Sequence, residues 1–354
     1  MKRLLFFMCA VGSLMITSCA NNPTTESMNG DIASELKLID SALRSKEYST
    51  SFSLALNNAY GGDTAASKKD SGETISKSFK HEKIAINLAG FYALECAIGF
   101  LGEKEPSKTP IDLLTIIVED KADSATQDIL NRFANATWKA SQPFRGMDRI
   151  QRYNFHPFNF LTASEVQKDY QQIKSAATKL LQAIRTDSAS SKSAQVNRIK
   201  ELLQSDEFAL EMASFLDSSY AANMRQAITP FLTAGQDTIT IRKSKSEEEI
   251  AVSLAGFYAL ECGVNYLVVS KGLAPSKICE MIIEGKLDAT DKSLFNRFAN
   301  ATWKTGQPFR SFERIHRSMF IPYDLLSAGV KDQDAQQIEA AAKQLLKMLQ
   351  SGQL

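Results

Sequence analysis

The chain has 354 residues, 44% of them hydrophobic and 23% charged, a composition typical of an ordinary globular protein of one or two domains. Its 41 lysine and arginine residues almost balance its 40 aspartate and glutamate residues. Because nucleic-acid binding needs a basic excess to neutralise phosphates, this balance argues against nucleic acid as a main partner.

The N-terminus has the order of an export signal. Two basic residues open the chain, an apolar run covers Leu4–Ile16, and a Thr-Ser pair precedes Cys19. The run is too short to cross a bilayer as a stable helix. The order resembles the lipobox signal of bacterial lipoproteins, as in Bacteroidota. That resemblance implies a signal peptide over residues 1–18 and acylation of Cys19. The alternative is an ordinary secretory signal in which Cys19 is incidental.

A flexible tether is predicted to follow the lipidated cysteine, over residues 19–31. Its polar, Asn-, Thr- and Ser-rich composition cannot bury enough apolar surface to become ordered. Ala20, and not aspartate, follows the cysteine, and resemblance to lipoprotein sorting in Gram-negative bacteria then implies the outer membrane, on a face left open. No later apolar stretch is expected to cross a bilayer, so the rest is predicted to be soluble.

The body of the chain contains the same segments twice. LAGFYALEC occupies residues 88–96 and 254–262, and NRFANATWK occupies residues 131–139 and 296–304. This predicts a tandem duplication of a unit of about 160 residues. The predicted boundaries are unit 1 over residues 32–186, a linker over 187–193 and unit 2 over 194–351. Whether the units form separate domains or one body is left open.

Both units are predicted to be all-α. Residues 84–100 and 250–268 are apolar nearly all round, which indicates a central buried helix in each unit. A glycine costs stability inside a helix, so Gly90 and Gly256 predict a close crossing by another helix. Thr238–Ile241 is the one short strand signal. Apolar spacing and helix-start prolines predict further helices at residues 123–141, 164–184, 288–306 and 332–349, and from Pro110 and Pro275.

Polar residues that are identical in the two copies require a reason, because surface residues drift freely. On the helix of the NRFANATWK segment, cationic and amide side chains share one face at helical spacing. Cations beside tryptophan suit anionic ligands or sugars. The candidate ligand surface comprises Trp138, Lys139, Arg145, Arg149, Trp303, Lys304, Arg310 and Arg314.

A structural role is the competing explanation. Glu95 and Glu261 lie in the middle of the two apolar helices, where an unpaired carboxylate is costly. Arg132 and Arg297 are their predicted ion-pair partners. A third reading makes the two glutamates the carboxylates of a hydrolase, which requires them to face one another across an open cleft.

The sequence implies no cofactor and no metal, since it holds none of the common catalytic or metal-binding motifs. Cys96, Cys262 and Cys279 are predicted to be buried thiols. Several triplets of Asp, Ser or Thr, and a small or aliphatic residue resemble the O-glycosylation sequon of Bacteroidota, and Asp63-Thr64 and Asp187-Ser188 lie in predicted loops.

These features predict a lipid-anchored cell-envelope binding or scaffold protein without catalytic activity. Its expected partners are the membrane, through the anchor, and an anionic envelope component or another envelope protein. Two alternatives remain: an all-helical envelope hydrolase acting on glycan or lipid, and a surface effector that engages another cell.

Overall fold

The computed structural model describes residues 30–61, 73–145, 150–185, 191–223, 238–243, 245–307 and 317–354. Within these ranges the fold is all-helical apart from one two-stranded ribbon, as the sequence predicts. The signal peptide, the tether up to residue 29 and most of the predicted linker lie outside the described residues. The described residues up to 185 are called the N-terminal half below, and those from 191 onward the C-terminal half.

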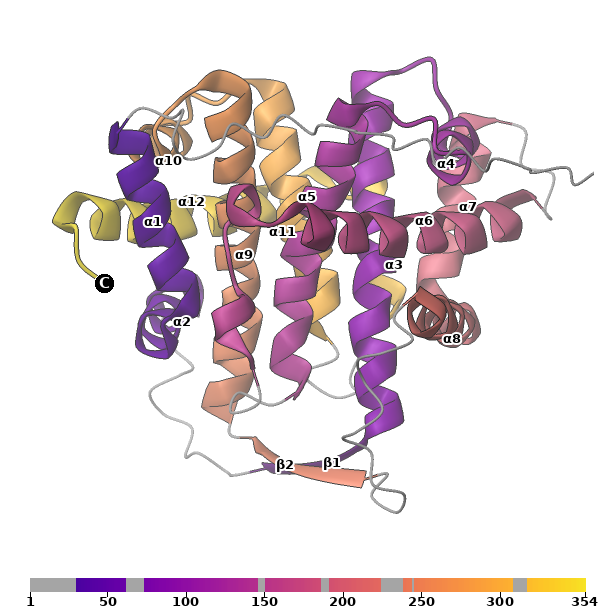
Figure 1. Ribbon diagram of the computed structural model, residues 1–354, viewed down its shortest axis with the longest axis horizontal. Coiled ribbons are helices and arrows are strands. Elements are labelled where there is room, and N and C mark those ends of the chain that lie inside the picture. Colours follow the sequence, from indigo (N-terminus) through magenta and orange to yellow (C-terminus); the bar gives the residue numbers. More distant parts are fainter. Residues whose placement is uncertain are drawn as a thin grey trace, which may run out of the picture.

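Four helices form the centre of the molecule (Figure 1). Two of them, α5 and α11, lie side by side between the other two, α3 and α9. The predicted central helices are α3 and α9, and almost every side chain described in their middle is buried. The bounds of the four are α3 Phe79–Lys104, α5 Ser124–Ser141, α9 Lys245–Lys271 and α11 Ala289–Gly306.

Two stretches of these helices correct the expectation that no later segment could cross a bilayer. Ile84–Lys104 and Ala251–Lys271 are long and apolar enough by length and composition, within the residues described. In their most apolar windows, 89% and 83% of the residues are buried inside the protein. Contact with other helices on all sides therefore accounts for their apolar character.

The outer helices exchange between the halves. The first two helices belong to the N-terminal half but pack on helices of the C-terminal half, at the left of Figure 1. There α2 packs on α9 and α12, and α1 contacts α10. The bounds are α1 Gly30–Arg44, α2 Lys46–Gly61, α10 Pro275–Ile283 and α12 Ala328–Ser351.

The reciprocal exchange occurs on the other side of the molecule. The first two helices of the C-terminal half, α7 and α8, pack on helices of the N-terminal half. There α8 packs on α3 and α6, and α7 contacts α4. The bounds are α4 Pro110–Val118, α6 Ala163–Arg185, α7 Lys192–Gln204 and α8 Asp206–Asn223. As a result, buried side chains of both halves belong to one continuous hydrophobic core.

Hydrogen bonds at two helix starts match this exchange. Glu35 of α1 accepts from the backbone N–H and the hydroxyl of Ser276, each at 2.7 Å, at the start of α10. Gln195 of α7 occupies the position equivalent to Glu35 and accepts from the N–H of Ile111, at 3.0 Å, at the start of α4. The N–H groups of Ser276 and Ile111 are backbone donors that a helix leaves free in its first turn, and these bonds satisfy them. The prolines predicted to begin α4 and α10 are at their first positions.

The ribbon joins the halves at the end of α3 and α9 shown at the bottom of Figure 1. Its strands are β1 (Glu73–Ser78) and β2 (Thr238–Lys243), which pair antiparallel with Ile75 opposite Ile241. The predicted strand signal lies in β2 and is confirmed. The sequence does not predict β1, because a strand of serine, lysine and threonine with one isoleucine carries little periodic signal.

The close crossings predicted at two glycines are confirmed. A Cβ on Gly90 of α3 would lie 3.2 Å from the side chain of Gln172 in α6. A Cβ on Gly256 of α9 would lie 3.2 Å from the side chain of Gln337 in α12. Each glycine thus lets a helix of its own half cross the central helix closely. Short 3-10 turns complete the described structure, at Gln142–Arg145, Arg152–Asn154, Phe158–Phe160, Arg317–Met319 and Tyr323–Leu325.

Candidate functional site

Two fully buried ion pairs connect the halves through the core. Lys139 of α5 donates to Glu261 of α9 at 2.6 Å, and both side chains are 0% exposed. Lys304 of α11 donates to Glu95 of α3, also at 2.6 Å, with the glutamate 3% exposed. Burial alone would lower the pKa of each lysine, but the adjacent carboxylate outweighs burial and holds the pKa above its ordinary value. Each lysine therefore keeps its charge inside the core.

The predicted partners of the two glutamates are wrong. Arg132 donates to Asp128, one turn earlier on α5, at 2.8 Å and to Asn159 at 3.0 Å. Arg297 donates to Glu103 of α3 at 2.9 Å and to Asp324 at 2.5 Å. Both arginines are buried, as a structural role requires, and their guanidinium groups lie over the rings of Phe158 and Tyr323.

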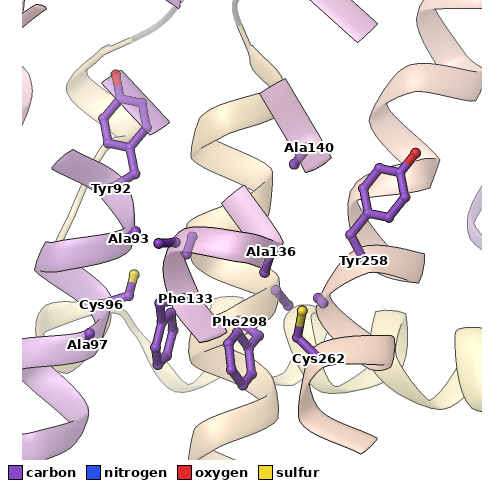
Figure 2. Close-up of a cluster of buried hydrophobic side chains, with 14 of the residues drawn as sticks. Tyr92, Ala93, Cys96, Ala97, Phe133, Ala136, Ala140, Tyr258, Cys262 and Phe298 are labelled. Carbon is purple, nitrogen blue, oxygen red and sulfur yellow. The ribbon is translucent and has the colours of Figure 1, made fainter. Parts of the chain in front are cut away.

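Two cysteines extend the contacts around the ion pairs. Cys96 contacts the side-chain oxygen of Asn300 at 3.6 Å, and Cys262 contacts that of Asn135 at 3.8 Å, in each case across the halves. Figure 2 shows the two cysteines on separate helices with Phe133 and Phe298 between them, and both thiols are free. Burial raises the pKa of each thiol well above its ordinary value. They are thus inert core thiols, as is Cys279, and the prediction of three buried thiols is confirmed.

Phe133 and Phe298 occupy equivalent positions on α5 and α11. Their rings stack with centroids 4.1 Å apart at the middle of the central cluster (Figure 2). Contact between a residue and its own counterpart is what an approximate twofold axis produces, because only residues near such an axis can meet their equivalents.

The tyrosines of the repeated LAGFYALEC segment contact the opposite half in the same way. Arg317 donates to the hydroxyl of Tyr92 at 3.2 Å, and Arg152 lies near enough to Tyr258 to lower the pKa that burial raises. Phe320 packs edge-on against Tyr92, and its equivalent Phe155 packs edge-on against Tyr258. Both tyrosines are buried in the core.

The candidate ligand surface is only partly described. Trp138 and Trp303 are half-buried and pack edge-on against Phe155 and Phe320. Lys139 and Lys304 are 0% exposed, so placing them on a ligand surface is a mistake. Helical spacing places Lys139 on the same face of α5 as Arg132, and Lys304 on the same face of α11 as Arg297. In the structure each lysine contacts a glutamate of the other half. The Arg145 side chain and the residues Arg149, Arg310 and Arg314 lie outside the described residues.

The sequence does not single out two aspartates that share equivalent positions. Asp169 of α6 lies near Lys139, and Asp334 of α12 lies near Lys304. Burial raises the pKa of each carboxyl to about 7, and the nearby lysine only partly offsets this. Asp334 Oδ2 is buried and accepts no hydrogen bond from the described residues. The repetition of an aspartate at both positions was the available signal.

Replacing both aspartates, Asp169→Asn with Asp334→Asn, is expected to raise the Tm, and to raise it more at pH 8 than at pH 5. Their folded pKa of about 7 lies above the ordinary value of 3.8, so the folded state binds more protons between those values. Stability therefore falls as the pH rises toward 7, and asparagine removes that loss. Thermal unfolding from pH 5 to pH 8 measures the effect, and a difference from wild type that does not change with pH would contradict it.

No group of three or more His, Cys, Asp or Glu side chains among the described residues could hold a metal ion. The two glutamates proposed for a hydrolase are each bound to a lysine in the core, and Glu261 is 0% exposed. The repeated lysines and glutamates among the described residues neutralise one another and hold the two halves together. Comparison with protein-family models, curated proteins and solved structures finds no match to this chain.

Proposed function

We propose that this protein is a lipid-anchored scaffold or binding protein of the cell envelope, held at the outer membrane by Cys19 and without catalytic activity. One observation carries the proposal. Among the described residues, the glutamates and lysines that are repeated in both copies lie in the core, where Lys139 pairs with Glu261 and Lys304 pairs with Glu95. Charged residues that a catalytic site would expose are instead paired inside the core, where they hold the two halves together. A single rigid body of this kind suits a protein that binds a partner or serves as a scaffold.

The same contacts support a tandem duplication. Several interactions between the halves have a counterpart at the equivalent positions: the capping of α4 and α10, the buried ion pairs and the stack of Phe133 on Phe298. Reciprocal contacts of this kind are the signature of a twofold homodimer. The duplicated gene would then encode in one chain what was a dimer of two identical chains with exchanged N-terminal helices.

The lipid anchor is tested by Cys19→Ser. We expect the wild-type protein to sediment with membranes and the variant to appear in the soluble fraction, because acyl chains supply the membrane affinity and the tether adds none. Fractionation followed by immunoblotting measures the split. As a matched control, Cys279→Ser changes a cysteine inside the core and should leave the protein with the membranes. A Cys19→Ser variant that stays membrane-bound would rule out the anchor.

A further inference from the structure

A cavity of about 250 Å³ lies among three helices of the structure. It opens between α3, α4 and α7, beside the turn that carries Pro322 and Asp324. Its wall is mainly apolar and includes the aliphatic side chains of Ile98, Leu113, Val196 and Ile199. The volume suits a small molecule and not a peptide or a protein segment.

The equivalent place in the other half holds apolar side chains. Three residues that line the cavity have equivalents of a different kind, and these three are Gly102, Lys108 and Lys192. Their equivalents in the repeated sequence are Val268, Leu273 and Ile32. Val268 and Ile32 are buried, and Leu273 packs against the hydrophobic core. The two halves therefore differ here, because one fills this place with its own side chains and the other leaves it hollow.

The arginine beside the cavity does not set this half apart. Gly99 lines the cavity, and a Cβ on it would lie 2.5 Å from Nη1 of Arg297, so the arginine packs directly against this glycine. Nη1 is buried and has no acceptor among the described residues, and the same is true of Nη1 of the equivalent Arg132. Because both halves share this donor, it selects no ligand for the hollow half.

Two charged residues of the wall are neutralised by partners outside the cavity. Glu95 accepts from Lys304 at 2.6 Å, inside the core. Lys108 pairs with Glu105, also at 2.6 Å, at the surface. Neither residue therefore gives the cavity a net charge.

The remaining charges of the wall also balance. Glu103 and Asp324 both bind Arg297, and Lys192 adds a second positive charge at the cavity. A charged ligand loses its hydration when it enters an apolar site, and here no net charge of the wall offsets that loss. A neutral ligand is therefore favoured over both a cation and an anion.

We propose that this cavity binds a small neutral molecule with a branched aliphatic body. The body takes the place that Val268, Leu273 and Ile32 fill in the other half, and it lies against the aliphatic wall. A hydroxyl group at the rim can donate to Glu103 or Asp324, whose side chains are 38% and 44% exposed. The proposal rests on the binding role proposed above and names its ligand class, but it does not depend on the anchor.

Isothermal titration calorimetry of the purified full-length protein in detergent tests this with three probes that share one carbon skeleton: isoamyl alcohol, isoamylamine and isovalerate. The heat of each probe titrated into detergent alone is subtracted. We expect the alcohol to bind at least tenfold more tightly than the amine or the carboxylate. No binding of the alcohol, or an amine or carboxylate that binds as tightly, would overturn the proposal. Because the assay contains no membrane, its failure is separate from a failure of the Cys19→Ser fractionation.

Three variants place the site. Gly102→Val copies Val268, and its Cβ would meet Leu113 and Lys192 at 3.7 Å and 3.8 Å, which is ordinary contact, so it should fold and lose binding of isoamyl alcohol. Gly102→Ala adds the Cβ alone and should weaken binding less. As a matched control, Gly329→Val places its Cβ in open space on α12 and should leave binding unchanged. Thermal melting confirms that each variant is folded. Undiminished binding in Gly102→Val, or an equal loss in Gly329→Val, would refute the site.

Discussion

Replacing Lys139 with methionine is expected to lower the free energy of unfolding by about 3–5 kcal/mol, because the change leaves Glu261 charged and unpaired in the core. Both side chains of this pair are 0% exposed, so water cannot replace the lost ammonium. The equivalent change, Lys304→Met, should cost a similar amount through Glu95. Urea unfolding followed by circular dichroism measures both.

A double variant and a surface control complete this test. Lys139→Met combined with Glu261→Leu removes both charges and should recover most of the lost stability, since apolar residues often replace a buried pair without cost. Lys343→Met breaks the exposed pair with Glu339 and should cost only about 0.3–0.5 kcal/mol. A single Lys139→Met variant as stable as the Lys343→Met control would show that the pair does not hold the halves together.

The elements of this fold could be predicted from local pattern. The runs around Gly90 and Gly256 are apolar on every face, and only a helix surrounded by others needs that. Asp123, Pro110 and Pro275 mark helix starts by their own chemistry, and Asp123 indeed caps α5 through a bond to the N–H of Thr126. In each case the information lies within a few residues of the element.

The partners of the charged residues could not be predicted in the same way. Arg132 and Lys139 lie on one face of α5, and helical spacing does not say which of them meets a glutamate. Lys139 reaches Glu261 because α5 packs against α9 of the other half, and no sequence period encodes that contact. A clue was available in the context of the lysine: its helix neighbours Ala136 and Ala140 are small and apolar, and the same lysine recurs at 304.

The exchange of the first two helices of each half could not be predicted from the sequence either. The repeat boundaries place α1 and α2 with unit 1, and sequence neighbours usually pack together. In the structure these helices pack on the C-terminal half, whose α9 and α12 present the same kind of surface as α3 and α6. The corresponding helices of the two halves share the same pattern of apolar residues, so local pattern does not tell on which half α1 and α2 pack.

Because of this exchange, neither half is expected to fold as a monomer. Residues 30–185 produced alone keep α1 and α2 but lose the surface on which those helices pack. They also expose Glu95 and Lys139, two charged groups at the core that need Lys304 and Glu261. The isolated half should therefore form a homodimer, in which Lys139 of one chain meets Glu95 of the other, or aggregate.

Coexpression gives the strongest form of this prediction. Residues 30–185 and residues 191–354, made as separate chains in one cell, should copurify as a 1:1 complex with a helical circular dichroism spectrum and one cooperative melt. Size-exclusion chromatography with light scattering measures the masses. Adding Lys139→Met to the first chain should weaken the complex, whereas Lys174→Met, which breaks an exposed pair with Asp120, should not. A compact, helical monomer of residues 30–185 that melts cooperatively by itself would mean that the exchanged packing is not required, since such a half would satisfy its buried charges and its core without the other.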